Sequence, residues 1–531
     1  MDRRKFVEVL ALTGSATAAL GTAPQALAAP VAFDVTEKTV AQLQSALQAG
    51  TVSGQQLVQL YLARIAALDK AGPQLNSVIE LNPDALAIAK TLDAERKVKG
   101  PRGPLHGIPV LLKDNIATAD RMQTTAGSLA LVGAKPPRDA FLVAQLRRAG
   151  AVILGKTNLS EWANMRSTRS TSGWSARGGL TRNPYALNRN TSGSSSGSGS
   201  SMAASLAAIA VGTETDGSIT SPASIAGLVG IKPTLGLVSR SGVIPIAHSQ
   251  DTAGPMTRTV ADAAALLTAM AGSDAQDSAT ALADQKKTDY TQALTRNGLQ
   301  GKRLGVVRSQ WAASTDLVVA ALESQLAVLK AQGAVLVDVP DIPNTNKYGE
   351  TELTVLLYEL KADLNAYLAE YAATAQVKTL ADVIAFNEKH RAQELPHFGQ
   401  EHFLAAQAKG DLKSQEYLDA LANNHRYSRA EGIDQVLKEH LLDALIAPTG
   451  GTAWLTDFIN GDAYGASFTS PAAVAGYPHI TVPAGQVHGL PVGLSFVGTA
   501  WTEAHLIGMA YAYEQASLQR RAPTFAATAK K

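Results

Sequence analysis

The chain has 531 residues, with 47 basic against 45 acidic side chains, and its formal charge of +2 predicts no nucleic-acid partner. It contains no cysteine, which excludes both disulfides and a thiol nucleophile. Its length suits one large α/β domain or two. After the N-terminus, no segment offers the roughly 18 apolar residues of a membrane span, so we expect no stable membrane insertion.

The N-terminus has the pattern of a targeting segment. Arg3 and Arg4 precede a mildly apolar stretch, and small residues at 26–28 resemble a cleavage site. Paired arginines are typical of twin-arginine signals, which export folded proteins. We therefore expect a signal peptide over residues 1–28 and a periplasmic or secreted mature chain over 29–531. The alternative is a short amphipathic N-terminal helix.

Apolar spacing predicts the main elements in chain order. Residues 39–68 have helical spacing in two pieces around Gly50. Short apolar runs at 107–112 and 151–154 predict buried strands, with a helix over 141–149 between them. This alternation predicts an α/β sheet with both faces covered. Further on, the pattern predicts a strand at 304–307, helices over 317–332 and 348–371, and a helical elaboration over about 275–440.

Two serine-bearing Gly/Ser loops dominate the middle of the chain. The first spans 191–200, an Ala-rich run predicted to be helical follows at 202–211, and the second loop holds Ser218, 24 residues after Ser194. Glycine allows close backbone approach, and successive N–H groups can form a nest for an anion. A flexible linker would have polar flanks, which this segment lacks. The layout indicates a serine hydrolase that does not use histidine.

Two other motif matches fail on their context. Residues 150–157 satisfy the nucleotide-binding Walker A pattern, but their variable positions are Ala-Val-Ile-Leu, which favours a buried strand over a phosphate loop. Residues 193–197 match the G-x-S-x-G elbow with Ser195 as nucleophile, but an apolar strand should lead into such a turn and the lead-in here is polar. The histidines show no zinc-ligand spacing, so we expect neither a metal nor a cofactor.

A serine nucleophile without histidine needs another base, and lysine is the usual substitute. At a pKa near 10.4, only about one lysine in 2,500 is neutral at pH 7, so the base must be buried. Lys113, Lys156 and Lys232 each follow an apolar run and qualify equally. A lysine at a strand end more commonly keeps its ammonium in water, and the residues alone do not choose among the three.

The ordered motifs resemble those of the amidase signature family over residues 36–515, with the signature region at 103–258. They include Leu-His-Gly-Ile-Pro-Val-Leu-Leu-Lys-Asp-Asn at 105–115 and Gly-Thr-Glu-Thr-Asp-Gly-Ser-Ile at 212–219, with further matches at 155–161, 193–197, 227–234, 251–258, 476–485 and 489–493. The resemblance implies one large α/β domain built on a twisted, mixed, mostly parallel sheet covered by helices on both faces.

The resemblance also implies a Ser-cisSer-Lys triad. In it Ser218 is the nucleophile, Ser194 the intermediate serine and Lys113 the base, and the reaction passes through an acyl-enzyme. Backbone N–H groups of Thr215, Asp216, Gly217 and Ser218 would form the oxyanion hole.

The sequence departs from the commoner family pattern at three positions. Ser196 and Asp216 stand where glycine is frequent, and Thr220 stands where arginine is frequent. These variants, with residues 236–245 and 248–251, look most like bacterial peptide amidases, which remove the C-terminal amide of peptides. The alternatives are an aryl or aliphatic acylamidase or an esterase with the same triad, and less strongly a transamidation subunit or a non-catalytic protein.

Substrate specificity in this family comes from variable segments, here including parts of 345–375 and 450–470. Trp454 and Phe458 follow an apolar strand and would either line a pocket or pack in the core. The expected partner is a small-molecule or peptide amide, and the expected state is a monomer.

Overall fold

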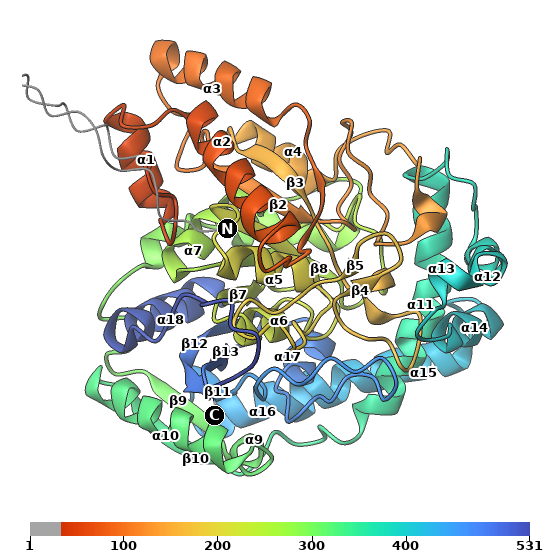
Figure 1. Ribbon diagram of the computed structural model, residues 1–531. Coiled ribbons are helices and arrows are strands. Elements are labelled where there is room, and N and C mark those ends of the chain that lie inside the picture. Colours follow the sequence, from red (N-terminus) through yellow and green to blue (C-terminus); the bar gives the residue numbers. More distant parts are fainter. Residues whose placement is uncertain (1–32, 531) are drawn as a thin grey trace, which may run out of the picture. The chain divides into compact units, whose positions relative to one another are not determined.

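The computed structural model describes residues 33–530. Within them a large mixed sheet forms the centre of the fold (Figure 1). Its strands lie in the order β1-β3-β2-β6-β8-β7-β12-β13-β11-β9-β10. Their bounds are β1 Val78–Leu81, β2 Pro109–Lys113, β3 Val152–Thr157, β6 Ile209–Glu214, β7 Val229–Lys232, β8 Thr252–Thr257, β9 Arg303–Val307, β10 Val335–Val339, β11 Ala444–Pro448, β12 His479–Val487 and β13 Leu490–Val497. A separate small ribbon pairs β4 Trp174–Ser175 with β5 Gly179–Leu180.

The predicted mixed sheet is observed, and its strand directions are segregated. The parallel pairs lie toward the two flanks, in β3-β2-β6 and in β11-β9-β10. The central run from β6 through β8, β7, β12 and β13 to β11 is antiparallel, as is the edge pair of β1 with β3. The expectation of mostly parallel pairing therefore holds at the flanks and not at the centre. One reason is the tight turn at His488 and Gly489, both at positive φ, because a turn this short can join only antiparallel strands.

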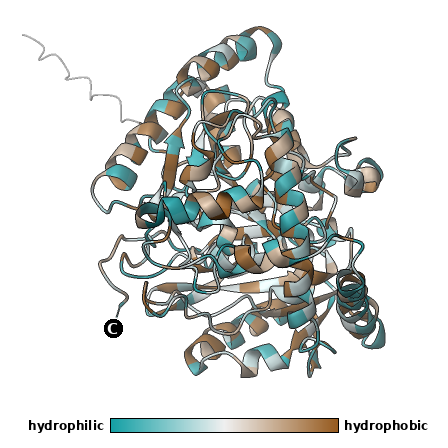
Figure 2. Cartoon of the chain, turned by 90° about the vertical axis from the view of Figure 1, so that its right-hand side faces the viewer, coloured by the Kyte–Doolittle hydropathy of each residue, from teal (hydrophilic) through white to brown (hydrophobic). Residues whose placement is uncertain are grey.

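Some helices pack directly on the sheet and others pack on neighbouring helices. Those at the surface carry both hydrophilic and hydrophobic residues (Figure 2). From the N-terminal side they are α1 Val40–Gln48, α2 Gly54–Arg64, α3 Ala85–Lys99, α4 Phe141–Arg148, α5 Ser196–Ala203, α6 Thr220–Ile225, α7 Val260–Met270, α8 Ala283–Lys286 and α9 Arg308–Ala312. There follow α10 Asp316–Ala331, α11 Tyr348–Glu370, α12 Leu380–Lys389, α13 Arg391–Glu394, α14 Glu401–Ala408, α15 Gln415–His425, α16 Asp434–Glu439, α17 Ser470–Ala475 and α18 Glu503–Ser517.

Most predicted elements are confirmed. The pattern over 39–68 forms α1 and α2, whose capping boxes begin at Thr39 and Ser53 and satisfy their first N–H groups. The first predicted strands and the helix between them are β2, α4 and β3, so the Walker A match is indeed a buried strand. The later predictions correspond to β9, α10 and α11.

The Gly/Ser segment differs from its prediction. The helix α5 lies within the Gly/Ser run itself, whereas the apolar run that was expected to be helical supplies β6. Small residues are required because this helix is wholly buried, and a Cβ on Gly197 would lie 2.3 Å from the Ser77 carbonyl oxygen. Its serines bond to backbone carbonyls, as when Ser198 Oγ donates to Val211 at 3.0 Å, which satisfies polar groups that burial would otherwise penalise.

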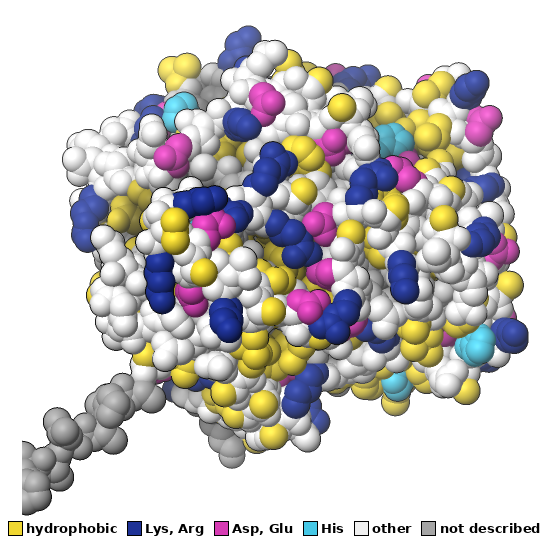
Figure 3. Space-filling view, turned by 90° about the horizontal axis from the view of Figure 1, so that it is seen from above, with side chains coloured by type: hydrophobic (Ala, Val, Ile, Leu, Met, Phe, Trp, Pro, Cys, Tyr) yellow, Lys and Arg dark blue, Asp and Glu magenta, His cyan; other side chains and the backbone are white. Residues whose placement is uncertain are grey.

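The segment 275–440 is not solely a helical elaboration. It contains β9 and β10, which complete one edge of the main sheet, while α11 to α15 gather at one side of the molecule (Figure 1). The described residues from Val35 onward cluster as one compact unit. The predicted signal peptide lies outside the described residues. Among the helices of the described part, none is both long and apolar enough to cross a membrane. The face seen in Figure 3 carries interspersed basic and acidic side chains.

Candidate active site

The loop that carries Ser218 is fixed at both ends. It leaves β6 at Glu214 and enters α6 at Thr220. The Glu214 carboxylate accepts hydrogen bonds from the backbone N–H groups of Ile219 at 2.8 Å and Thr220 at 2.9 Å. A carboxylate here satisfies N–H groups at the start of α6, which have no acceptor within the helix. The short loop at 215–218 is therefore held between a central strand and a helix.

Ser218 faces a cavity of about 320 Å³ at the end of β6. Its side chain is mostly buried, and its hydroxyl makes no hydrogen bond to another described residue. The backbone N–H groups of Asp216, Gly217 and Ser218 likewise have no acceptor within the described chain. Gly217 has a φ of 75°, which turns the loop. A hydroxyl and free N–H groups thus meet at one cavity, which suits attack on a carbonyl and binding of the resulting oxyanion.

Ser194 and Lys113 are brought together beneath this loop. The Gly193–Ser194 peptide bond is cis. Lys113, at the end of β2, donates from Nζ to Ser194 Oγ at 2.7 Å, and both residues are fully buried. The backbone N–H of Ser195 donates to the Ser218 carbonyl at 3.2 Å, which joins the two serine loops. No direct hydrogen bond links the hydroxyls of Ser194 and Ser218 among these residues.

The structure distinguishes the three candidate lysines, although all are buried. Lys156 Nζ donates to the Ile116 carbonyl at 2.6 Å and to Thr124 Oγ1 at 2.8 Å. Lys232 Nζ donates to the Pro233 carbonyl at 3.3 Å. Of the three, Lys113 is the one hydrogen-bonded to a serine of the Gly/Ser loops. Burial lowers the pKa of Lys156 and of Lys232 to about 8.

Burial lowers the pKa of Lys113 further, to about 7, against the opposing influence of the Asp251 and Glu214 carboxyls. Desolvation disfavours the ammonium form, and here it outweighs these two acidic neighbours. A lysine with this pKa is neutral in a substantial fraction of molecules at pH 7. Lys113 can therefore accept a proton, which a lysine in water at the same pH rarely does.

Thr213, Asp251 and Asn115 belong to the site although sequence reasoning did not single them out. Thr213 Oγ1 accepts hydrogen bonds from Lys113 Nζ at 2.8 Å and from Asn115 Nδ2 at 2.9 Å, which orients the amine. Thr215 Oγ1 donates to Asp251 Oδ1 at 2.5 Å, which ties the Ser218 loop to the start of β8. Thr213 lies in the second recognised motif, and its alternation along β6 could have suggested an inward side chain.

The cavity wall comes from several parts of the chain. Both variable segments contribute, as expected: Leu356 from α11, and Tyr464, Ser467 and Thr469 from the segment before α17. Trp454 borders a smaller adjoining space and donates from Nε1 to Asp462 at 3.2 Å. Phe458 stacks on His397 with ring centroids 3.9 Å apart. The remaining lining residues are Ala163, Asn164, Met165, Gly193, Thr215, Asp216, Gly217, Ser221 and Ile246.

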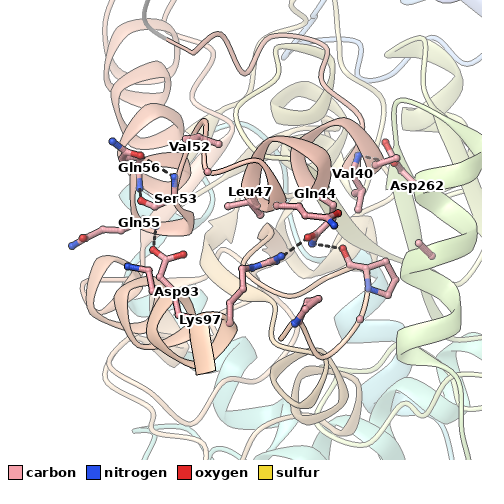
Figure 4. Close-up of a pocket in the computed structure, with 18 of the residues that line it drawn as sticks. Val40, Gln44, Leu47, Val52, Ser53, Gln55, Gln56, Asp93, Lys97 and Asp262 are labelled. Carbon is pink, nitrogen blue, oxygen red and sulfur yellow. Dashed lines mark hydrogen bonds between the residues drawn. The ribbon is translucent and has the colours of Figure 1, made fainter. Parts of the chain in front are cut away.

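A larger hollow, of about 1230 Å³, lies away from these residues between α1, α2, α3 and α7 (Figure 4). Gln44, Leu47 and Asp93 are among its lining residues, and none of the predicted site residues is. The described residues also contain one group with metal-ligand geometry, His248, Glu359 and Asp363. There His248 Nδ1 shares a hydrogen bond with Asp363 Oδ2 at 2.9 Å and Nε2 lies 3.3 Å from Glu359 Oε1, so the imidazole lies between the two carboxyl groups.

The expected role of the loop at 215–218 in binding the oxyanion can be tested at Gly217. An added Cβ would lie 3.0 Å from Thr469 Oγ1, so Gly217→Ala should displace the free N–H groups and lower kcat about 10- to 100-fold with little change in KM. Gly100→Ala is the matched control, because Gly100 has a similar φ of +78° and open space around it. Steady-state kinetics on both variants would measure the difference. Equal losses would contradict a role of this loop in catalysis.

Comparison with known proteins gives consistent matches across the chain. The model of a family described as Amidase matches residues 56–507. The solved structure of native peptide amidase from Stenotrophomonas maltophilia is 54% identical, and the match covers 92% of this chain and 99% of that chain with a TM-score of 0.88. A probable amidase of Arabidopsis thaliana is 44% identical over 505 residues, 93% of each chain. A glutamyl-tRNA(Gln) amidotransferase chain from Halorhodospira halophila is 35% identical over 498 residues, covering 90% of this chain and 97% of that protein.

Proposed function

The chain belongs to the amidase signature family and is a hydrolase acting on amides, and on this basis we propose that it removes the C-terminal amide of peptides with release of ammonia. The observation that carries the proposed chemistry is the 2.7 Å hydrogen bond from Lys113 Nζ to Ser194 Oγ. It provides a buried base next to the serine loop that adjoins Ser218.

The proposed reaction moves one proton through two serines. As Ser218 Oγ attacks the amide carbonyl, its proton passes to Ser194 Oγ, whose own proton passes to neutral Lys113. Free N–H groups at 216–218 stabilise the oxyanion. The C–N bond then breaks, the relay returns a proton to the leaving nitrogen, and ammonia departs. Water cleaves the acyl-enzyme by the same relay and gives the free acid.

The cavity supports a small, uncharged carboxamide as the reacting group. Its lining is mostly neutral, with small side chains such as Gly217 and Ser221, and with Asp216 as the acidic group beside Ser218. A terminal carboxamide is neutral, whereas a terminal carboxylate would meet the Asp216 carboxyl. The similarity to solved peptide amidase structures favours a peptide as the rest of the substrate. The paired arginines at the N-terminus support export, which would place the enzyme among extracellular peptides.

The proposal is tested by measuring ammonia release from a panel of peptide amides, with anilides, esters and glutamine as comparison substrates. We expect ammonia from peptide amides while the internal peptide bonds remain intact by mass spectrometry. Preferential cleavage of anilides or esters would contradict the peptide proposal and indicate an acylamidase or esterase. Release from free glutamine alone would instead indicate a transamidation-type activity.

A further inference from the structure

Two carboxyl groups meet at the loop that carries Ser218, beside the cavity. Asp216 lies two residues before Ser218, and Glu352 lies on α11, which is distant in the sequence. The two carboxyls lie close enough to share a hydrogen bond if one of them is protonated. Ser470 Oγ donates to Asp216 Oδ2 at 2.5 Å, and the Thr469 hydroxyl lies beside the same carboxyl.

Gln250 connects the same pair to the loop from a third element. Its Nε2 donates to Glu352 Oε1 at 2.9 Å and to the Thr215 carbonyl at 3.3 Å. Glu352 on α11 therefore reaches the Ser218 loop in two ways. It contacts Asp216 of the loop directly, and it is linked to the Thr215 carbonyl through Gln250. A movement of Glu352 would be transmitted to the backbone whose N–H groups face the cavity.

A hydrogen bond between two carboxyls requires a proton on one of them, because carboxylates only accept. Burial raises the pKa of Asp216, and burial together with the Asp216 carboxyl raises the pKa of Glu352 well above its ordinary value. Two adjacent carboxyls ionise separately, and the second proton is held more tightly. The other titratable groups of the described chain that interact with the pair are Lys232, Glu214 and Tyr348. Glu352 is therefore the protonated member at neutral pH.

We propose that protonated Glu352 is a positioning residue that holds Asp216, and through it the N–H groups of Gly217 and Ser218, in the geometry that binds the oxyanion. This inference rests on the proposed Ser218 chemistry, and it adds a residue on α11 to that site. Loss of the Glu352 proton in alkaline solution would place two negative charges side by side, and their repulsion would displace the loop.

The proposal predicts the shape of the pH profile. Activity rises with pH as Lys113 becomes neutral, through its pKa of about 7. It then falls as the pH passes the raised pKa of Glu352. Glu352→Gln keeps a hydrogen-bond donor toward Asp216 but has no proton to lose, so its alkaline fall should vanish or move upward by at least one pH unit. Glu352→Ala should lose at least tenfold in kcat at every pH with little change in KM.

The experiment compares kcat of the wild type, Glu352→Gln and Glu352→Ala from pH 6 to 10. Glu350→Gln is the matched control, since Glu350 is exposed on the same helix, and its profile should follow the wild type. A second readout is the rate at which a fluorophosphonate reagent labels Ser218, measured over the same range. This reagent labels Ser218 whatever the natural substrate is. Labelling without cleavage of peptide amides would therefore count against the proposed function, and its pH dependence would still test the role of Asp216 and Glu352.

A Glu352→Gln profile that superimposes on the wild type in both readouts would overturn the inference. If Glu352→Gln does not fold, as judged by thermal unfolding, Asp216→Asn serves in its place. The introduced carboxamide can accept from neutral Glu352 or donate to its carboxylate, and it carries no charge to repel. The alkaline fall in labelling of this variant should also vanish, and an unchanged fall would likewise overturn the inference.

Discussion

Replacement of Ser218 by alanine is expected to lower kcat/KM for amide hydrolysis by about four orders of magnitude or more, because the variant cannot form an acyl-enzyme. The hydroxyl faces the 320 Å³ cavity and bonds to no other described residue, so its removal leaves no buried group unpaired. The free energy of unfolding should therefore change little. Ammonia release and thermal unfolding, measured on the same preparation, would show loss of activity without loss of the fold.

Ser221→Ala is the matched control for this experiment. Ser221 lines the same cavity, and its hydroxyl bonds to Ser192 Oγ at 2.8 Å, away from the relay. We expect this variant to keep activity within about tenfold of the wild type, the cost of one neutral hydrogen bond. Undiminished hydrolysis by Ser218→Ala would refute the mechanism. Equal losses of activity in both variants would show that any substitution in the cavity impairs hydrolysis. That result would contradict the assignment of Ser218 as the nucleophile.

Replacement of Lys113 by methionine is expected to lower kcat by about a thousandfold or more, because the proton from the serine relay then has no acceptor. The protein should nevertheless unfold at the same or a higher temperature. The pKa of Lys113 is about 7 in the folded chain and near 10.4 when unfolded, so at pH 7 the unfolded chain binds more protons at this site. The contribution of Lys113 to the free energy of unfolding consequently increases as the pH rises from about 7 to about 10, and burying it is unfavourable below that window.

Lys156→Met is the control, since it removes an equally buried lysine that bonds to Ile116 and Thr124 and to neither serine loop. We expect it to retain most of the activity and to show the same rise of activity with pH. A wild-type profile that did not fall below pH 7, or an active Lys113→Met variant, would contradict the assignment of the base.

Local patterns predicted the elements near the site better than they predicted the arrangement of the sheet. Strands β2 and β3 are buried on both faces, so they appear in the sequence as continuous apolar runs that can be predicted directly. The secondary structure of the Gly/Ser run was harder to predict, because the low intrinsic helix propensity of glycine and serine favours a loop. In the folded chain this run nevertheless forms helix α5, and neighbouring backbone approaches so closely that a Cβ at Gly197 would clash with it. That closeness is a property of the assembled fold.

The order of amino acids was enough to identify the family, the buried strands, and two serine loops with three candidate lysines, because these follow from motif residues and local apolar spacing. Which lysine contacts a serine depends on the folded chain. Strands β2 and β6 pair in parallel and bring Lys113 against Ser194 and Thr213, whereas Lys156 and Lys232 end beside other groups. Folding also places Glu352 of α11 against Asp216, a contact between segments far apart in the chain. The sequence determines which ionisable group each side chain carries. The pKa of that group depends on its burial and on its neighbours, and only the folded chain determines those.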